Sequence, residues 1–475
     1  MKSQKNVMIC RVNEKFLHTV CFLSCLLLGT FCVFLDYFPK RDLLVSSVIS
    51  YLLYQKTFLE FSIERKLAAG AFLSGVCLYA VVWHIVPAIT KTVSKETQNV
   101  RLCLTLLILC GGVYETCSVT RLPQYLIKSI QHTVIYQTHY ATFITPPHHL
   151  NKPPENIILV ITESLENTYG NESLFPTNPL KKTGKIPAIR AGGETEIAGL
   201  DSTLASMVGM FCGIPLFPAI STRGRVRAPL FQNMNCLPDI LKKSGYHVSF
   251  YAADPLRFAS KDDFLKAHSF DEIKGADELK SARSVQSNAF IGINDKELFR
   301  LSLERLKDLS RKDKPFAFFI LTLNMHDPFG HLEKGCPAET KTFADVVSCF
   351  DGVLADFLED LKTLPNYKNT VVVVTGDHLA RKNNLLPVLG KEGNRTIFNM
   401  FLNVGGDFSK RHTAFTAMDI GATVSDAAGL SADGRLGLGR SLLRDEPTMI
   451  ELYGKEKLES ELMKKSDEYN GFLRE

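Results

Sequence analysis

The sequence has no strong excess of charge of either sign, and this narrows the classes of function open to it. Its 475 residues include 55 lysines and arginines and 50 aspartates and glutamates, which leaves a formal net charge of +5. The basic residues are interspersed with acidic ones, and they form no cluster of the kind that binds nucleic acid. We therefore expect no nucleic-acid partner.

Cysteine is scarce beyond residue 120. Eight of the 12 cysteines lie in or beside the apolar first third of the chain, where they behave as small hydrophobic residues. The rest of the chain contains four, which fall into two pairs that are close in sequence: Cys212, Cys236, Cys336 and Cys349. This pattern favours disulfides and an oxidising compartment, but four buried thiols would fit the same spacing.

Long apolar runs are confined to the beginning of the chain. Residues 17–38, 67–89 and 102–119 are each apolar over about the length that a helix needs to cross a bilayer, and residues 43–55 form a shorter run typical of an interfacial or re-entrant segment. Basic residues precede the first and the third run and favour a cytoplasmic location there. We expect a membrane anchor with about three transmembrane helices over residues 1–120, and the rest of the chain outside the cytoplasm.

Composition divides the remainder of the chain. Residues 121–153 contain several tyrosines and a Pro-Pro-His-His corner, which is typical of a juxtamembrane helix and linker. The pair Pro153 and Pro154 marks the start of one large soluble domain over residues 154–450, which is compatible with the length of the chain. Residues 451–475 are left as a C-terminal tail.

Four apolar runs in the soluble domain predict strands that are covered on both faces, as in a parallel sheet. They occupy residues 157–161, 247–253, 316–323 and 371–374, the last of which is four consecutive valines. Helix-like stretches at residues 236–244, 295–309 and 344–362 lie between or beside them. The alternation predicts an α/β fold with a mostly parallel sheet flanked by helices.

Residues that can carry chemistry follow each run. In chain order they are Glu163, Asp254, His326 with Asp327, and Asp377 with His378. Because parallel strands end at one edge of a sheet, where open α/β sheets bind their ligands, we expect these side chains to converge. Carboxylates beside imidazoles can hold a divalent cation. Taken alone, the last pair would equally fit a helix cap and a histidine that merely packs.

A helix predicted from residue 203 onwards offers a nucleophile. Apolar residues recur at helical spacing from residue 204 to residue 211, and Asp201 or Ser202 is placed as the N-cap. Thr203 then lies in the first turn, where the helix dipole and the backbone N–H groups favour an anion. Metal coordination would complete the activation of its hydroxyl. Two alternatives stay open: Ser202 and Thr203 are only capping residues, or Thr195 beside a Gly-Gly pair is the nucleophile.

Five short segments carry a resemblance to a known family. They are ESLENTY at residues 163–169, TLAS at 203–206, CGIPLF at 212–217, RFASKDDFLKAHSFD at 257–271 and DHLA at 377–380. On the basis of these segments, residues 155–445 resemble the alkaline phosphatase/sulfatase superfamily. Within it, the chain is most similar to membrane-anchored phosphoglycerol transferases that modify periplasmic glucans. It is more distantly similar to lipoteichoic acid synthase and lipid A phosphoethanolamine transferases.

The resemblance implies a metal site and a nucleophile. It selects Thr203 over Thr195 as the residue that attacks. It also implies one divalent metal ion, manganese or zinc, held by four ligands: Glu163, Thr203, Asp377 and His378.

Further roles come from the same resemblance. It implies that Lys261 contacts the phosphoglycerol group, aided by Asp254 and Arg257, and that His326 neighbours the transferred phosphate. Cysteines that flank these motifs in the family imply two disulfides, which pair Cys212 with Cys236 and Cys336 with Cys349.

The implied reaction is transfer of phosphoglycerol from phosphatidylglycerol to an envelope glycan or lipid-linked acceptor through a covalent phosphothreonine. The implied setting is the bilayer of a bacterial inner membrane, with a multi-pass anchor and the catalytic domain on the periplasmic side. Glucan-modifying relatives continue past the position of Glu475, a difference that bears on the acceptor and not on the chemistry.

Other functions remain open at this stage. One is phosphoethanolamine transfer to lipid A or a glycan, and another is a non-catalytic, sulfatase-like membrane partner protein. Sulfatase activity itself is disfavoured, because no Cys/Ser-x-Pro-x-Arg segment stands at the nucleophile position.

Overall fold

The computed structural model describes residues 131–144, 155–217, 231–280, 292–337 and 342–473, and the backbone of two short strands, β2 (Ala219–Ile220) and β3 (Val226–Arg227). All of these residues belong to one compact unit, residues 127–475. The membrane spans expected at residues 17–38, 67–89 and 102–119, the run at 43–55 and much of the linker lie outside the described residues. Within the described ranges, no helix has the length and apolar character to cross a bilayer.

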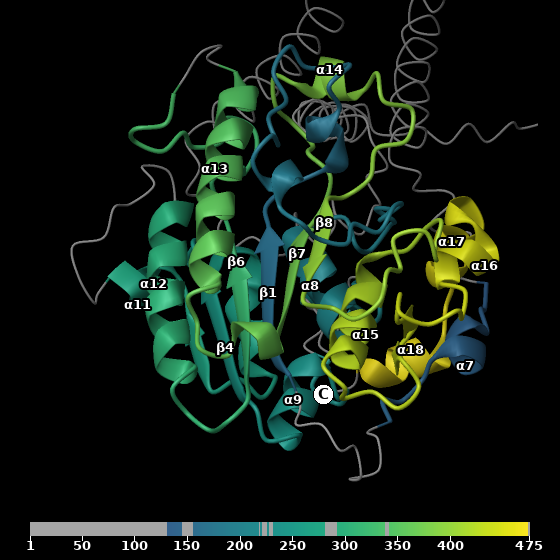
Figure 1. Cartoon of the computed structure of the whole chain (residues 1–475). Coiled ribbons are helices and arrows are strands. Elements are labelled where there is room, and N and C mark those ends of the chain that lie inside the picture. The colour runs from purple at the N-terminus through teal and green to yellow at the C-terminus, as the bar shows by residue number, and fades with distance from the viewer. Residues whose placement is uncertain are drawn as a thin grey trace, which may run out of the picture. The chain divides into compact units, whose positions relative to one another are not determined.

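A six-stranded sheet forms the centre of the unit, in the order β5-β4-β6-β1-β7-β8 (Figure 1). Its strands are β1 (Asn156–Thr162), β4 (His247–Ala252), β5 (Glu272–Lys274), β6 (Phe316–Leu321), β7 (Thr370–Gly376) and β8 (Asn399–Leu402). Every neighbouring pair is parallel except β7 with β8, which is antiparallel. The mostly parallel sheet predicted from the apolar runs is therefore confirmed.

The register brings the carboxyl ends of four strands to one edge. Ile161 of β1 pairs with Leu321 of β6 and with Thr375 of β7, and Leu321 also pairs with Ala252 of β4. β1, β6 and β7 are buried along their whole length, as strands covered on both faces require. The segments after β4, β6, β1 and β7 thus lie next to one another in that order.

Helices cover both faces of the sheet. On one face lie α12 (Asp295–Leu309) and α13 (Phe343–Leu361), whose Phe299 and Phe357 stack with ring centroids 4.4 Å apart. On the other lie α8 (Thr203–Cys212), α9 (Leu237–Lys243) and α15 (Ala417–Ala427); Phe211 of α8 packs 5.0 Å from Phe319 of β6 (Figure 1). The predicted ranges 236–244, 295–309 and 344–362 agree closely with α9, α12 and α13.

The remaining elements are short. They are α7 (Ile135–His139), α10 (Lys261–Lys266), α11 (Ala276–Lys280), α14 (Leu386–Leu389), α16 (Met449–Tyr453), α17 (Lys455–Leu462), α18 (Asp467–Phe472), the hairpin strands β9 (Arg435–Leu436) and β10 (Gly439–Arg440), and the 3-10 turns η2 (Asn167–Gly170), η3 (Thr183–Lys185), η4 (Phe258–Ser260) and η5 (Tyr367–Asn369).

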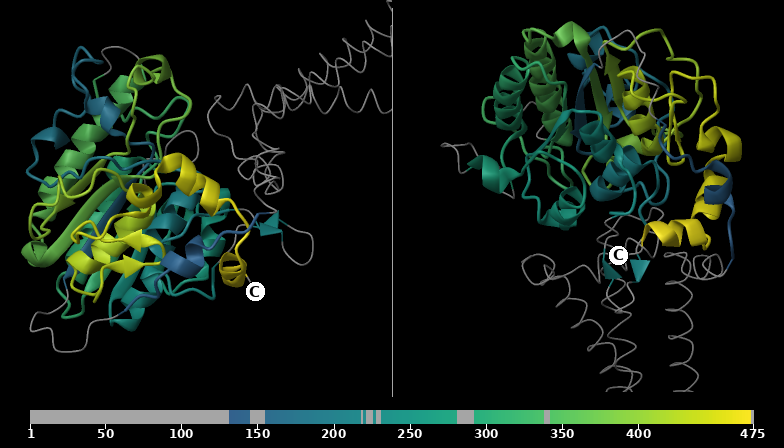
Figure 2. Two further views of the ribbon diagram at one scale, coloured as in Figure 1. Left: turned by 90° about the vertical axis from the view of Figure 1, so that its right-hand side faces the viewer. Right: turned by 90° about the horizontal axis from the view of Figure 1, so that it is seen from below.

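The segment expected as a C-terminal tail is helical and packed. Its helices α17 and α18 bury Leu458, Leu462 and Tyr469. The ring of Tyr469 lies 5.3 Å from that of Tyr136 in α7, so the two ends of the described chain meet (Figure 2). These apolar side chains are buried by a partner far away in sequence, which local composition does not reveal.

The hydrogen bonds of Glu451 in α16 are expected to weaken in acid. Its carboxylate accepts the N–H of Thr413 at 2.7 Å and of Thr448 at 3.0 Å, and it pairs with Nδ1 of His412 at 2.9 Å. Burial raises the pKa of Glu451, but these hydrogen bonds outweigh burial and lower it to about 2. Because the folded pKa lies below the unfolded value of about 4.3, the contact stabilises the fold fully above that pH. The stabilisation is lost as the pH falls toward 2.

We therefore expect Glu451→Gln to lower the melting temperature at pH 7 and to lower it less at pH 3. Thermal unfolding of the variant and the parent protein across this pH range measures both effects. A melting-temperature difference that stays constant with pH would contradict the assignment.

Two disulfides cross-link the unit. Cys212 at the end of α8 is joined to Cys236 before α9, and Cys336 after β6 is joined to Cys349 in α13. The bridged residues are 24 and 13 positions apart in sequence, so restriction of the unfolded chain stabilises the fold by about 3 kcal/mol for each bridge.

The double variant Cys336→Ala/Cys349→Ala is expected to lose about 3 kcal/mol of unfolding free energy in urea. A reductant also opens the Cys212–Cys236 bridge, so in its presence the parent protein and the variant should have the same unfolding free energy. An unchanged urea midpoint in the oxidised double variant would show that this bridge does not restrain the chain.

Candidate metal centre

Three side chains meet at the carboxyl edge of the sheet. Glu163 directly follows β1, and Asp377 and His378 directly follow β7; one potential ligand atom of each lies within 4.8 Å of the others. Nε2 of His378 is 3.5 Å from Oε1 of Glu163 and 3.5 Å from Oδ2 of Asp377. Ligands of a tetrahedral ion at bond lengths of about 2.1 Å stand about 3.4 Å apart. The spacing therefore suits one cation with a further ligand position open.

The local backbone orients the three side chains. Oδ1 of Asp377 accepts the N–H of Ser164 and that of His378, each at 2.8 Å. Ser164 adopts a φ of 51°, which is uncommon outside glycine and turns the chain directly after Glu163. Nδ1 of His378 lies 3.0 Å from the carbonyl oxygen of Leu379 and donates to it, so Nε2 carries the lone pair. This is the arrangement of a histidine that binds a metal through Nε2.

The electrostatics of this group favour a cation. Burial, followed by the charge of Asp377, raises the pKa of Glu163 well above its usual value. Oδ2 of Asp377 is buried and makes no hydrogen bond with any described residue. A buried carboxylate oxygen without a donor is costly. A divalent cation bound here would coordinate Oδ2 of Asp377 and offset the repulsion between Asp377 and Glu163. The residues therefore fit a metal ion.

A second polar group lies after β4 and β6. Nζ of Lys261 is buried, 2.6 Å from Oδ2 of Asp254 and 2.8 Å from the carbonyl oxygen of Phe258. Oδ1 of Asp254 is also buried without a hydrogen-bond donor among the described residues. Asp254 therefore keeps one acceptor for a ligand. Phe258 links this group to the segment after β6, since its ring lies 6.1 Å from that of His326.

His326 connects the two groups. Burial lowers the pKa of His326. Nδ1 of His326 lies 2.7 Å from the carbonyl oxygen of Asp327 and donates to it, so Nε2 is left as an acceptor. The ring is thus neutral near pH 7 and available for proton transfer.

Arg257 stands apart from these residues. Its side chain is 75% exposed and forms an ion pair with Asp277. The chain bends at Ala259 and Ser260, both at positive φ, before Lys261 enters the interior. The guanidinium of Arg257 therefore faces solvent and a surface carboxylate in this structure, and its expected contact with a substrate stays a prediction.

The two threonines considered as nucleophile lie in different settings. Thr203 is the first residue of α8, directly after the N-cap Ser202, and its side chain is half-buried. The hydroxyl of Thr195 donates to the carbonyl oxygen of Gly193 at 2.8 Å. The hydroxyl of Thr195 is therefore engaged within its own turn, whereas Thr203 stands at a helix N-terminus.

Glu196 is a member of the site that the sequence did not single out. Its Oε2 accepts the N–H of Leu379 at 2.8 Å, directly beside His378. Burial raises the pKa of Glu196, and the positive charge of Arg381 opposes this shift. Glu196 thus joins the segment before α8 to the loop after β7. In the sequence it is only an acid in a glycine-flanked turn, a pattern also found on surfaces.

Two further carboxylates support the same loop. Oδ2 of Asp327 accepts the N–H groups of Arg381 at 2.6 Å and Lys382 at 2.7 Å. Glu166 is buried, pairs with Arg395 and accepts the N–H of Ala380 at 3.1 Å. The loop after His378 is held by carboxylates from three other segments, which restricts the positions of the candidate ligands.

The fold and the site together define an α/β protein with a candidate metal centre at the carboxyl edge of a parallel sheet. The family model described as Sulfatase matches residues 155–430, more than half of the chain, and the chain belongs to this family. The resemblance to the alkaline phosphatase/sulfatase superfamily seen in the sequence is confirmed.

Two similar proteins of known name are both phosphoglycerol transferase I. The chain is 34% identical over 337 residues to phosphoglycerol transferase I of Citrobacter koseri, an alignment that covers 67% of this chain and 43% of the relative. It is 35% identical over 322 residues to phosphoglycerol transferase I of Escherichia fergusonii, covering 65% and 41%. The chain thus spans less than half the length of these curated relatives. A solved structure of a protein in the alkaline phosphatase superfamily from Vibrio parahaemolyticus is similar with a TM-score of 0.49 and 22% identity, covering 65% of this chain and 74% of that chain.

Proposed function

We propose that this protein transfers a phosphoglycerol group from phosphatidylglycerol to a hydroxyl group of an envelope glycan. The observation that carries the proposal is the buried triangle of Glu163, Asp377 and His378, with its unsatisfied carboxylate oxygen, in a chain similar to phosphoglycerol transferase I. We further propose that residues 1–120 anchor it in a bacterial inner membrane, with the catalytic domain on the periplasmic side. Two disulfides support an oxidising compartment for that domain.

In this proposal Glu163, Asp377, His378 and the hydroxyl of Thr203 hold one divalent cation, manganese or zinc. When bound, the cation neutralises charge on phosphoryl oxygens and lowers the pKa of a hydroxyl group in contact with it. Two carboxylates, a hydroxyl and one imidazole suit both ions.

Thr203 supplies the nucleophile of a two-step transfer. Its Oγ1 forms a bond to phosphorus while the bond from phosphorus to the diacylglycerol oxygen breaks. Nε2 of His326 takes the hydroxyl proton and passes it to the leaving oxygen, which requires the neutral ring that its lowered pKa provides. The products are diacylglycerol and a phosphothreonine that carries glycerol. In the second step a sugar hydroxyl attacks phosphorus, its proton leaves by the reverse route, and Thr203 is regenerated.

Asp254 and Lys261 serve to bind the transferred group. Nζ of Lys261 supplies a fixed positive charge beside the phosphoryl oxygens, and its ion pair with Asp254 holds it in place. The unsatisfied Oδ1 of Asp254 suits a hydroxyl donor of glycerol. An ethanolamine ammonium group would also satisfy this oxygen, and the experiment below distinguishes the two donors.

The test is to incubate the full chain with manganese and vesicles of phosphatidylglycerol, without an acceptor, and to search its peptides by mass spectrometry. We expect a glycerophosphoryl group on Thr203 and release of about one diacylglycerol per protein. A phosphoethanolamine adduct formed only with phosphatidylethanolamine vesicles would replace the proposed donor. Absence of any adduct, in protein that elemental analysis shows to be free of metal after incubation, would favour a non-catalytic partner protein instead.

A further inference from the structure

One arginine beside the candidate metal centre is left without a partner by the chain itself. Arg381 lies four residues after Asp377, in the loop that follows β7. Nη2 of its guanidinium is buried and makes no hydrogen bond with any described residue. A buried donor without an acceptor is costly, because it has lost its water and gained nothing in exchange. This nitrogen therefore suits an acceptor that comes from a ligand.

The loop that carries Arg381 runs from the end of β7 across two neighbouring segments. The N–H of Ala380 donates to Glu166, which follows β1, and the N–H of Arg381 donates to Asp327, which follows β6. In the sheet, β1 lies between β7 and β6. The loop thus crosses the carboxyl ends of these strands and is held at both contacts. Arg381 is presented from a fixed backbone, beside the segment that contains His326.

The charge of Arg381 reaches the carboxylates of the site. Burial raises the pKa of Glu163 and that of Glu196, and the positive charge of Arg381 opposes both shifts. Oε2 of Glu196 already accepts the N–H of Leu379 at 2.8 Å. A divalent cation held by Glu163 and Asp377 would balance the charge of those two carboxylates. The guanidinium then remains available for a further anion.

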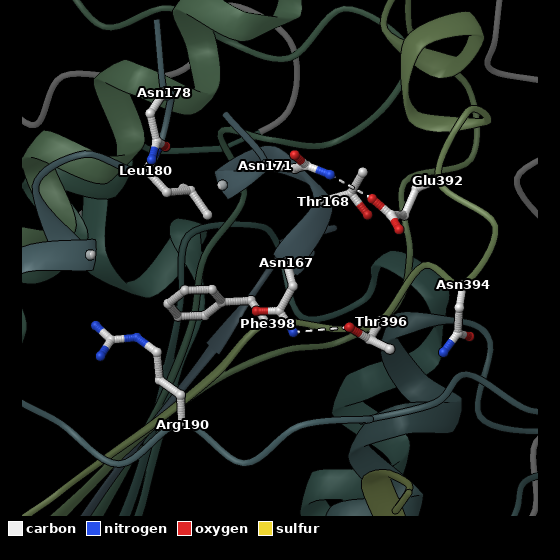
Figure 3. Close-up of a pocket in the computed structure, with 12 residues that line it drawn as sticks. Asn167, Thr168, Asn171, Asn178, Leu180, Arg190, Glu392, Asn394, Thr396 and Phe398 are labelled. Atoms are coloured by element: carbon white, nitrogen blue, oxygen red, sulfur yellow. Dashed lines mark hydrogen bonds between the residues drawn. The ribbon is translucent and has the colours of Figure 1, made fainter. Parts of the chain in front are cut away.

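Arg190, in another part of the unit, shows what a satisfied arginine looks like. It lines a hollow of about 400 Å³ beside the turn after β1 (Figure 3). Its guanidinium donates to the carbonyl oxygen of Thr183 at 2.7 Å. In the same hollow, the amide of Asn171 donates to Glu392 at 2.7 Å (Figure 3). These donors are satisfied within the chain and point to no ligand, in contrast to Nη2 of Arg381.

We propose that the guanidinium of Arg381 binds a non-bridging oxygen of the phosphoryl group that is transferred. The proposal rests on the proposed function and adds a substrate-binding residue to it. A phosphodiester has two non-bridging oxygens, so the cation contacts one and Arg381 contacts the other. Arg381 and Lys261 then act as two fixed positive charges on the phosphoryl group, and they stabilise it further as negative charge grows during the attack by Thr203. The site thereby favours an anionic phosphodiester over a neutral ester.

Binding of glycerol 1-phosphate to the full chain, loaded with manganese in detergent, tests the proposal without turnover. Calorimetry measures the affinity, and elemental analysis measures the metal content of each sample. We expect Arg381→Gln to bind this probe about tenfold more weakly or worse at unchanged metal content. Arg311→Gln is the matched control, because it removes the same charge from an exposed arginine outside the site, and its affinity should equal that of the parent protein.

A merely structural role of Arg381 predicts a different result. If its guanidinium only offset the charges of Glu163 and Glu196, its loss would change metal affinity and melting temperature, and the affinity of the metal-loaded protein for glycerol 1-phosphate would not change. Equal affinity of Arg381→Gln and the parent protein for the probe, at equal metal content, overturns the proposal. Absence of binding to the parent protein overturns it as well.

Arg381→Lys keeps the test decisive if Arg381→Gln does not fold, because it retains a positive charge in the same place. Lysine offers a point charge instead of a planar fork of donors, so the affinity for glycerol 1-phosphate should fall by about threefold or more. In that case an affinity equal to that of the parent protein overturns the proposal.

Diacylglycerol release separates this proposal from the proposed function. Arg381→Gln should lower kcat/KM for release by about 100-fold or more, and Arg381→Lys should recover part of the loss. Failure of the parent protein to release diacylglycerol contradicts the proposed function, whereas binding of glycerol 1-phosphate still decides the role of Arg381.

Discussion

Replacing Thr203 with alanine is expected to reduce diacylglycerol release and glycan transfer by about 10⁴-fold or more, because the attacking oxygen is lost. The fold should be retained, since Thr203 is a half-buried residue at the start of α8 and alanine is favourable in a helix. Three ligand side chains remain, so bound metal should fall by much less than activity. Activity in phosphatidylglycerol vesicles, circular dichroism and elemental analysis measure the three effects.

Thr195→Ala is the matched control for this experiment. It removes the same hydroxyl group eight positions earlier, where the hydroxyl donates only to Gly193 within its turn. We expect activity within a few-fold of the parent protein. Thr203→Ser should retain part of the activity, because it keeps the hydroxyl oxygen. If the two alanine variants exchanged their outcomes, Thr195 would be the nucleophile and the assignment of Thr203 would be wrong.

Asp377→Asn is expected to remove metal binding and activity together while the loop around it keeps its shape. The amide oxygen of asparagine can replace Oδ1, which accepts the N–H groups of Ser164 and His378. The amide NH₂ group then occupies the position of Oδ2, where it cannot act as a metal ligand. We expect bound metal to fall from about one ion per chain to nearly none, and activity to fall by about 10³-fold or more.

Thermal unfolding distinguishes this ligand role from a merely structural one. With excess metal, the parent protein gains about 2.7 kcal/mol when the free ion is at 100 times its dissociation constant, and the variant gains nothing. With a chelator present, the parent protein should no longer be more stable than the variant, because the substitution removes the repulsion between Asp377 and Glu163. Asp351→Asn is the control: Asp351 is a buried carboxylate that accepts the N–H groups of Lys182 and Thr183, and its loss should lower stability with and without metal. A variant of Asp377 that still binds one ion would rule out the proposed centre.

Four strands of the six-stranded sheet, β1, β4, β6 and β7, were predictable because each carries its evidence locally, whereas the short strands β5 and β8 were not predicted. Unbroken apolar runs such as residues 371–374 are stable when both faces are covered, and Asp377 and His378 follow directly where that strand ends. The same reasoning applies to Glu163 after β1 and Asp254 after β4. The start of α8 was also predictable, because the N-cap and the apolar spacing that mark it are adjacent in sequence.

The residues that sequence reasoning missed all depend on distant partners. Glu166 accepts a hydrogen bond from Arg395, 229 positions later, and Glu196 accepts one from the N–H of Leu379, 183 positions later. Both are ordinary acids in a local window. The role expected for Arg257 stays a prediction, and the tertiary structure adds only that its guanidinium lies at the surface beside Asp277, before the chain bends at Ala259 and Ser260.

The sequence by itself determined the four central strands β1, β4, β6 and β7, the helices beside them, and the polar residues that stand at their ends, because hydrophobic periodicity and capping act over a few neighbouring residues. Only the tertiary structure decided that Glu163, Asp377 and His378 have their ligand atoms within 4.8 Å of one another. The physical reason is strand order: β7 pairs beside β1 although more than 200 residues separate them, and no local pattern encodes that choice.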